Sequence, residues 1–245
     1  MTLGIAFVIV FLGGLIQGFS GFGYSQFTVP WLLFFFEPVV VMPIALMHSI
    51  ILNLQVLFDV RKWVDIKHIW ILIAGGLLGI PIGTYILLVV DVNIIRILVG
   101  IVIVVSSLII IKGFRIKLKH EKPAFIPIGF IGGILGGSVT MSGPPVILFF
   151  SSQGVSKNYM RANLAMFFLS LNILTLPFYI AKGLINQTTL SYFAILLIAL
   201  VLGTFIGIKL SRLTGEKIFR KIALFILIAI GIFCTITGIF MKYCL

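Results

Sequence analysis

Charged residues are scarce in this chain, and acidic residues are the scarcest. Only 10% of the 245 residues are charged, with 18 Lys and Arg against 6 Asp and Glu, and the mean hydropathy is +1.28. Soluble globular domains carry about a quarter charged residues, so the composition excludes that class. Several uncharged runs approach or exceed the roughly 20 residues that cross a bilayer as a helix: 3–36, 69–90, 97–111, 124–153, 163–181 and 183–208. The composition therefore predicts an all-α polytopic membrane protein.

The few cysteines, histidines and carboxylates form no pattern typical of a catalytic or metal site. Cys234 and Cys244 lie on one predicted helix, about 15 Å apart along its axis, which is too far for a disulfide. The spacing of Asp59, Asp65 and His68 fits no metal-binding motif. None of the six carboxylates is placed as a deep proton or sodium carrier, since all lie at span ends or in loops: Glu37, Asp59, Asp65, Asp91, Glu121 and Glu216. We expect no catalytic residue, metal or cofactor.

The net charge of +12 does not indicate a nucleic-acid partner. The basic residues lie in short breaks between apolar runs, and no stripe of aromatic and basic residues accompanies them. The expected partners are the lipid bilayer and a small anionic substrate. The oligomeric state stays open, with a homodimer as one alternative.

The two halves of the chain contain the same motifs in the same order. Residues 13–18 match residues 132–137 at an offset of 119, and Asn53 matches Asn172 at the same offset. After a short insertion, the offset becomes 124 for a second glycine motif: Gly79 and Gly83 match Gly203 and Gly207. We therefore predict two repeats, residues 1–116 and 117–245.

Each predicted repeat begins with an uncharged segment that is too long for one straight crossing, 4–36 or 124–152. The first is interrupted by Ser20-Gly21-Phe22-Gly23 and the second by Ser142-Gly143-Pro144-Pro145, where helix propensity is poor. We expect each segment to form a broken or re-entrant hairpin of two short helices. The remaining predicted spans are 39–59, 69–90 and 94–111 in the first repeat, and 160–181, 190–209 and 218–240 in the second.

The distribution of Lys and Arg supports the hairpins. With hairpins that enter and leave on one side, fifteen basic residues lie on one face of the membrane and three on the other, whereas single crossings would divide them ten to eight. Cytoplasmic loops are enriched in Lys and Arg, so we predict a multi-pass protein of a prokaryotic inner (plasma) membrane with both termini outside the cytoplasm. Each repeat then crosses an odd number of times. The second repeat is inverted relative to the first, as in many secondary transporters.

The hairpin tips are the predicted substrate site. A broken helix is tolerated in a bilayer where its backbone is buried in protein or lines a watery cavity, and a helix that begins there points N–H groups at an anion. Hydroxyl and amide groups without charge favour an oxyanion that binds and then leaves. The candidate substrate-binding residues are Ser20, Gly21, Phe22, Gly23, Tyr24, Ser25, Gln26, Asn53, Ser138, Thr140, Met141, Ser142, Gly143, Pro144 and Asn172.

Some of these features also have a purely structural interpretation. The glycine motifs at 79–83 and 203–207 have the spacing that lets helices pack closely in lipid. His48, predicted near the middle of the bilayer, is either a proton-coupling relay or a hydrogen-bonded packing residue. Arg161, at the predicted cytoplasmic end of its span, either attracts the anion or only orients the helix. The sequence leaves these alternatives open.

At its glycine clusters the chain resembles the sulfite exporter TauE/SafE family, also called the toluene-sulfonate uptake permease family. The resemblance is carried by Gly14-x-x-x-Gly18-x-x-Gly21-x-Gly23 with Pro30 and Leu32, by Gly133-x-x-Gly136-Gly137 with Gly143-Pro144-Pro145, and by Arg161-Ala162-Asn163. It implies a permease for sulfite, sulfonates or related organosulfur anions. Relatives often carry glycine where this chain has Tyr24, Ser25, Thr140 and Ser142, which changes the predicted lining and leaves the particular anion open.

The expected mechanism is alternating access in a secondary transporter, with export as the favoured direction. Without a carboxylate carrier, the membrane potential is one available drive, and it expels a monoanion with about 2.3 kcal/mol per 100 mV. Uptake would need a coupled cation or proton. The alternatives are a passive anion channel that uses the same cavity and, more remotely, a membrane-embedded enzyme.

Overall fold

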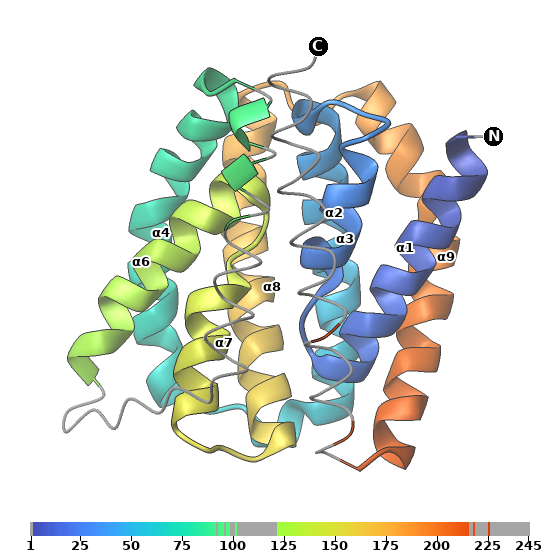
Figure 1. The fold of residues 1–245 in the computed structure, drawn as a ribbon. Coiled ribbons are helices and arrows are strands. Elements are labelled where there is room, and N and C mark those ends of the chain that lie inside the picture. The colour runs from blue at the N-terminus through green and yellow to red at the C-terminus, as the bar shows by residue number, and fades with distance from the viewer. Residues whose placement is uncertain are drawn as a thin grey trace.

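The computed structural model describes residues 2–91, 93–95, 97–98, 101, 122–215, 218 and 225 (Figure 1). Strands are absent from these described residues, and the all-α prediction is confirmed. The elements in chain order are α1 (Thr2–Ser20), α2 (Tyr24–Leu32), α3 (Pro38–Val60), the short 3₁₀ helix η1 (Arg61–Trp63), α4 (Ile66–Val89), α6 (Lys122–Val139), α7 (Gly143–Ser152), α8 (Lys157–Ala181) and α9 (Gln187–Leu213).

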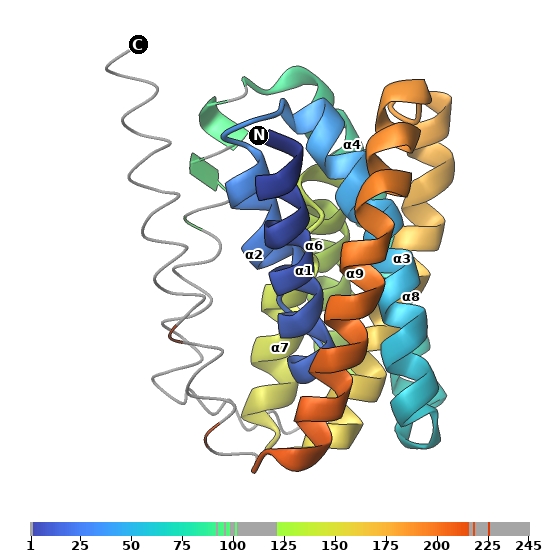
Figure 2. The ribbon, with the colours of Figure 1, turned by 90° about the vertical axis from the view of Figure 1, so that its right-hand side faces the viewer.

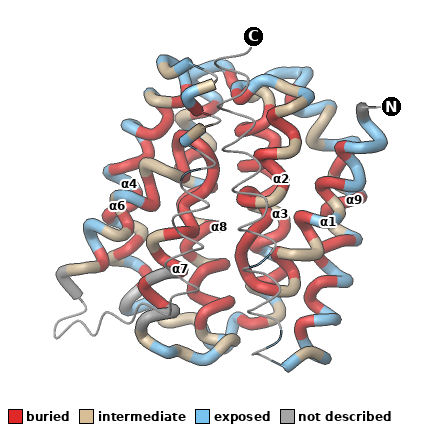
Figure 3. Tube along the Cα trace, in the orientation of Figure 1, coloured by how far each residue is buried: buried red, intermediate tan, exposed pale blue. Residues whose placement is uncertain are grey.

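Five helical segments have the length and apolar composition to cross a membrane: Leu3–Ser20, Pro38–Trp63, Ile69–Val89, Lys157–Ala181 and Gln187–Leu213. Ala124–Val139 is a shorter apolar helix. Large apolar side chains stay exposed on the outer faces of the bundle, as lipid contact requires (Figure 3); Leu78 and Ile198 are each 64% exposed. The chain is therefore a multi-pass membrane protein. The predicted spans 94–111 and 218–240 lie largely outside the described residues.

Both long uncharged segments form hairpins. Residues 21–23 break the first and residues 140–142 break the second. The prediction of two short helices is wrong for the first helix of each hairpin, because α1 has 19 residues, about 28 Å, and α6 has 18. Only α2 and α7, with 9 and 10 residues, are short. Pro144 and Pro145 stand in the first turn of α7, where the absence of an N–H removes no helical hydrogen bond, so the second break precedes them.

The helices of the two halves begin at equivalent positions. α2 and α7 begin at Tyr24 and Gly143, and α3 and α8 begin at Pro38 and Lys157; each pair is 119 residues apart, as are the sequence motifs. In Figure 1, α1 and α3 run downward while α6 and α8 run upward, and α4 and α9 are opposed in the same way. This arrangement is consistent with two inverted repeats. The predicted boundary at 116 lies outside the described residues.

Glycines bring two pairs of helices into backbone contact, α4 with α6 and α1 with α9 (Figure 2). A Cβ atom at Gly133 would overlap the carbonyl oxygen of Gly76, and one at Gly203 would overlap that of Phe11. The packing interpretation of the motifs at 79–83 and 203–207 is therefore confirmed. The hairpin glycines serve the same two contacts, each of which joins a helix of one half to a helix of the other: Gly14, Gly18, Gly133 and Gly137.

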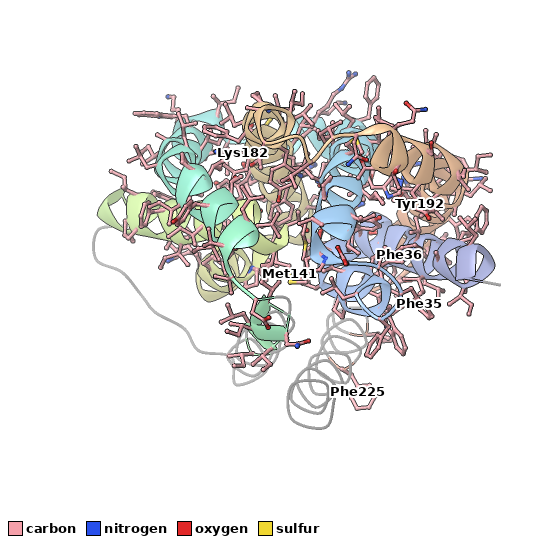
Figure 4. All side chains as sticks on the ribbon, turned by 90° about the horizontal axis from the view of Figure 1, so that it is seen from above. Phe35, Phe36, Met141, Lys182, Tyr192 and Phe225 are labelled. Carbon is pink, nitrogen blue, oxygen red and sulfur yellow. The ribbon has the colours of Figure 1, made fainter. Side chains whose placement is uncertain are left out.

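Most described basic residues lie where α3 and α9 end and α4 and α8 begin, and we call this the basic end of the bundle. They are Arg61, Lys62, Lys67, Lys157, Arg161, Lys209 and Arg212. Lys182 lies at the opposite end, where α8 ends; Figure 4 views the molecule from that end. The basic end is the predicted cytoplasmic side.

Candidate substrate site

A cavity lies between the two hairpin tips. Its volume is about 20 Å³, which leaves room for one or two water molecules. Viewed from above in Figure 4, Met141 lies near the middle of the bundle. The described residues that line the cavity are all uncharged: Gln17, Gly23, Ser25, Gln26, Ser49, Thr140, Met141, Ser142, Gly143, Phe168 and Asn172.

Buried amides hold the first tip against α3. Gln17 Nε2 donates to Asn53 Oδ1 at 3.0 Å, and the Tyr24 backbone N–H donates to Gln17 Oε1 at 2.9 Å. Asn53 Nδ2 in turn donates to Ser49 O at 2.7 Å and to Ser49 Oγ at 3.1 Å. Because the oxygen and the nitrogen of both amides are engaged, Gln17 and Asn53 have fixed orientations and position the tip beside the cavity.

The second tip reverses the chain at the same relative position as the first. Thr140 has φ 55° and Gly21, 119 residues earlier, has φ 81°, so both adopt the left-handed conformation that follows many helices. Thr140 Oγ1 donates to Val139 O at 2.7 Å, a local bond that offsets part of the strain of a β-branched residue in this region. Tyr179 OH donates to Gly137 O at 2.9 Å and anchors the tip to α8.

Two short helices begin at the cavity. Gly23 and Ser25 at the start of α2, and Ser142 and Gly143 at the start of α7, are among its lining residues. The N–H groups at a helix N-terminus carry partial positive charge and attract anions. Among the first three residues of α7 only Gly143 has such an N–H, because Pro144 and Pro145 lack one. Gln26, 5% exposed, adds an amide to the lining, and its Oε1 has no partner among the described residues. The lining is rich in hydrogen-bond donors and suits a small oxyanion.

A family comparison agrees with this chemistry. The sequence model of the sulfite exporter TauE/SafE family matches residues 6–234, nearly the whole chain. The chain belongs to this family. No curated protein and no solved structure matches the chain. TauE/SafE proteins are transporters and not enzymes, so this member is a membrane transporter of the sulfite or sulfonate type.

Eight of the predicted substrate-binding residues line the cavity of this TauE/SafE member: Gly23, Ser25, Gln26, Thr140, Met141, Ser142, Gly143 and Asn172. The other seven are not among its lining residues: Ser20, Gly21, Phe22, Tyr24, Asn53, Ser138 and Pro144. Ser20 and Ser138 donate back to the carbonyl oxygens of Ile16 and Ile134, both at 2.7 Å. The Ser138 hydroxyl therefore bonds to its own helix, and the Ser20 hydroxyl also accepts from the Phe22 backbone N–H at 3.1 Å within the first tip.

Three lining residues were not predicted from the sequence: Gln17, Ser49 and Phe168. Ser49 lies one helical turn before Asn53, and Phe168 lies one turn before Asn172, so each shares a helix face with a predicted residue. Helical periodicity was the signal that would have identified both of them. Helical periodicity does not identify Gln17, because its position beside the cavity depends on how the first tip folds against α3.

His48 is completely buried beside the cavity and is not among its lining residues. Its Nε2 lies 3.1 Å from Phe193 O, and its Nδ1 lies 2.8 Å from Tyr24 OH. Because a carbonyl oxygen only accepts, Nε2 carries the proton of the neutral ring and Nδ1 accepts from Tyr24. Two engaged ring nitrogens favour the packing interpretation, and proton coupling through His48 stays a prediction.

Arg161 is buried at the basic end, only 2% exposed. One terminal nitrogen donates to Asp59 Oδ2 at 3.1 Å, and the other donates to Gly18 O at 2.8 Å, at the end of α1. Its side chain also lies against Gly21 of the first tip. Arg161 therefore connects α8 to α3 and to the first hairpin, and it lines a second cavity rather than the one between the tips.

Asn163, the last residue of the family motif Arg161-Ala162-Asn163, fixes the turn between α3 and α4. Its Oδ1 accepts from the Asp65 backbone N–H at 2.8 Å, and its Nδ2 donates to Trp63 O at 3.2 Å and to Tyr159 O at 2.8 Å. The motif thus attaches α8 to the first half of the chain through residues of a single helical turn.

Gly21→Ala is expected to destabilise the protein more than Gly154→Ala. Both glycines have left-handed φ values, 81° and 67°, so both variants carry a similar backbone strain of about 1 kcal/mol. Only at Gly21 would the new methyl group meet a neighbour, Arg161 Cγ at 2.7 Å and Cα at 3.0 Å, whereas nothing lies within 4 Å at Gly154. We expect thermal unfolding in detergent to give a melting temperature several degrees lower for Gly21→Ala. Equal melting temperatures would contradict this contact.

Proposed function

We propose that this chain is a secondary transporter that carries sulfite, a sulfonate or a related small organosulfur anion by alternating access, and that it works as an exporter. The proposal is carried by one observation, the small uncharged cavity between two hairpin tips. Membership of a family of sulfite- and sulfonate-type transporters supports the choice of anion.

The lining of the cavity supports reversible binding of an oxyanion. Hydroxyl groups of Ser25, Ser49 and Ser142 gather there with the amide of Gln26. Hydrogen bonds from such neutral donors to a charged group each contribute about 1.5–3 kcal/mol. A Lys or Arg in the same place would bind an oxyanion roughly twice as strongly and would slow its release. Several weak donors therefore serve transport better than one strong one.

The size of the cavity supports a carrier mechanism. Sulfite, a sulfur atom with three oxygens, needs more room than one or two water molecules, so the tips must separate to admit it. Each tip also touches the opposite half of the chain: Gly21 lies against Arg161 of α8, and Thr140 contacts Met42 of α3. Movement of one half against the other would therefore release the tips in turn, as in other transporters with inverted repeats.

Export follows from the available driving force. No carboxylate is among the described residues that line the cavity, and both ring nitrogens of His48 are occupied by hydrogen bonds. The described residues thus offer no ready site for a coupled cation. The membrane potential alone drives a monoanion out of a cell with about 2.3 kcal/mol per 100 mV.

Ser142→Ala tests the site, because it removes one donor at the start of α7 without adding bulk. We expect sulfite to stabilise this variant against thermal unfolding only at a roughly tenfold higher concentration than the native protein, the effect of losing one hydrogen bond to a charged group. Ser191→Ala is the matched control, since that hydroxyl is exposed on α9 and bonds only to Gln187 O. An identical response of native protein and Ser142→Ala would remove the cavity from the substrate site. Sulfonates and simple carboxylates in the same titration define the preferred anion.

Counterflow in proteoliposomes separates a carrier from a passive channel. For a carrier, unlabelled sulfite loaded inside the vesicles accelerates the entry of labelled sulfite, because each binding site returns to the outer face loaded. We expect this acceleration and a saturable rate. Its absence, with a rate that rises linearly with concentration, would identify a channel.

A further inference from the structure

A second cavity lies at the basic end, where α3 and α9 end and α8 begins. It measures about 560 Å³, far more than the cavity between the tips. We call it the vestibule; it is lined by Asp59, Val60, Trp63, Ser156, Lys157, Asn158, Arg161, Ser211, Arg212 and Thr214. Three of these residues are cationic and one is anionic, so the vestibule attracts anions.

One carboxylate occupies the position between two guanidinium groups of the vestibule. Asp59 Oδ2 accepts from Arg161 at 3.1 Å, and Asp59 Oδ1 accepts from Arg212 Nε at 3.1 Å and from an Arg212 terminal nitrogen at 2.6 Å. The Arg161 side chain is 3% exposed, whereas that of Arg212 is 67% exposed. Asp59 thus ties α3 to α8 and α9 with a group that has the acceptor geometry of a small oxyanion.

Two buried polar atoms of the vestibule residues have no hydrogen-bond partner among the described residues. They are Arg161 Nε and Ser211 Oγ, and the residues are 2% and 3% exposed. A buried donor without a partner destabilises a protein by about 1–3 kcal/mol, more when it is charged.

We propose that the vestibule is a loading site for the transported anion, in which the anion takes the place of the Asp59 carboxylate on Arg161 and Arg212. The ligand class is a small oxyanion with at least two acceptor oxygens, because a guanidinium group binds such anions through paired donors. This inference rests on the proposed function, and sulfite and sulfonates belong to the class. Exchange of Asp59 for the anion breaks the link between α3 and α9, so arrival of substrate loosens the basic end.

The equivalent position at the other end of the bundle carries no charge. By the 119-residue offset, Arg161 corresponds to Met42 and Gly21 corresponds to Thr140. Both pairs are in contact, since Gly21 lies against Arg161 and Thr140 Oγ1 lies 3.8 Å from Met42 Sδ. The two halves therefore make the same contact, once with a guanidinium group and once with a thioether. A cation at this position in one half and a neutral residue in the other favours loading from the predicted cytoplasmic side, as export requires.

The end of α1 separates the vestibule from the central cavity, and vestibule cations hold it. Arg161 donates to Gly18 O at 2.8 Å in the last turn, where carbonyl groups lack helical partners and a cation is favourable. Lys157 Nζ lies 5.8 Å from the centroid of the Phe19 ring. Gln17, in the same turn, lines the central cavity. Arg161 therefore touches both the loading site and the barrier that the anion must pass.

Substitutions at Asp59 and Arg212 test the loading site in opposite directions. Asp59→Asn removes the competing carboxylate, so sulfite should stabilise the purified full-length variant at a roughly fivefold lower concentration than the native protein. Arg212→Gln removes an exposed cation and leaves the pair of Asp59 with Arg161. It should raise the required sulfite concentration roughly fivefold, and raise KM for sulfite transport with kcat unchanged. Thermal unfolding across a sulfite titration is the measurement, with sulfate as a second anion.

Arg61→Gln is the matched control. Arg61 is exposed at the same end, lies 5.3 Å from the centroid of the Phe58 ring, and does not line the vestibule. This variant should respond to sulfite like the native protein. An equal change in the required sulfite concentration for Arg61→Gln and Arg212→Gln would show that diffuse surface charge causes the change. This result would overturn the loading site. A folded Asp59→Asn variant with unchanged or weaker sulfite binding would also overturn it, and if Asp59→Asn does not fold, the two arginine variants decide.

The Ser142→Ala titration keeps this inference distinct from the proposed function. Altered sulfite binding in the vestibule variants alone, with a native response in Ser142→Ala, would support the loading site and exclude the central cavity. Weaker binding in Ser142→Ala, with vestibule variants that behave like Arg61→Gln, would exclude the loading site and leave the central cavity standing.

Discussion

Gly133→Leu is expected to prevent the chain from reaching its folded state. A Cβ atom at Gly133 would overlap the carbonyl oxygen of Gly76 on α4 and would lie 2.8 Å from the Gly76 Cα. Overpacking costs about 1–3 kcal/mol, and occasionally more, where side chains can shift, and here the obstacle is backbone. Helices in lipid depend on such close approach, because the bilayer supplies no hydrophobic drive between them. We expect the variant to give no monodisperse peak in size-exclusion chromatography after detergent extraction.

Gly4→Leu is the control for that experiment. A Cβ atom at Gly4, on α1, would have no neighbour within 4 Å, so a leucine there meets open space toward the lipid. This variant should elute and unfold like the native protein. If Gly133→Leu did the same, the backbone contact between α4 and α6 would be wrong.

The glycine motifs show how far the sequence predicts helix packing. Their spacing predicts that four helices carry faces able to approach closely. The spacing does not predict which helix faces pack together. All four motifs are alike, so any pairing of them would be compatible with close packing. The structure pairs Gly133 with Gly76 and Gly203 with Phe11, so each contact joins the two halves of the chain. That choice follows from the whole arrangement of helices, which no single motif contains.

The positions of the hairpin breaks were predictable from the sequence. The backbone conformation at the breaks and the lengths of the flanking helices were less predictable. Gly21 indicates a left-handed residue after α1, since glycine adopts positive φ without strain. Thr140 gives no such indication, because a β-branched residue rarely adopts φ 55°, and the prolines after it suggested a later break. A long run of uncharged residues also does not indicate where a helix within it ends. The prediction of equal short helices failed for that reason, although the hairpins themselves were found.

Some residues of the site were predictable from the local sequence, whereas the placement of others depends on residues far away in the chain. Residues at the tips, such as Ser142 and Gly143, were predicted because polar groups beside a helix break in lipid need a cavity. Arg161 was predicted as a cation at a span end that either attracts the anion or only orients the helix. Its burial depends on the Asp59 carboxylate, 102 residues earlier in the chain, and on the carbonyl oxygen of Gly18. Charge and hydropathy along the chain reveal neither partner.

Gly143→Leu is expected to abolish sulfite transport while the protein remains folded. A Cβ atom at Gly143 would lie 3.0 Å from Ile147 Cδ1, 3.1 Å from Gln26 Nε2 and 3.3 Å from Phe168 Cζ. These are the ends of side chains, which shift by a few tenths of an ångström at modest cost, in contrast to the backbone that faces Gly133. The rest of the leucine side chain then occupies a cavity that holds only one or two water molecules. The rate of labelled sulfite transport in proteoliposomes should fall to that of protein-free vesicles.

Gly215→Leu adds the same side chain where nothing lies within 4 Å, and it should keep the native transport rate. The melting temperature of Gly143→Leu without sulfite should stay within a few degrees of the native value, because its neighbours can yield. Sulfite should no longer raise it. A native transport rate in a folded Gly143→Leu variant would show that the anion crosses elsewhere, since the leucine side chain occupies the cavity that the anion is proposed to use.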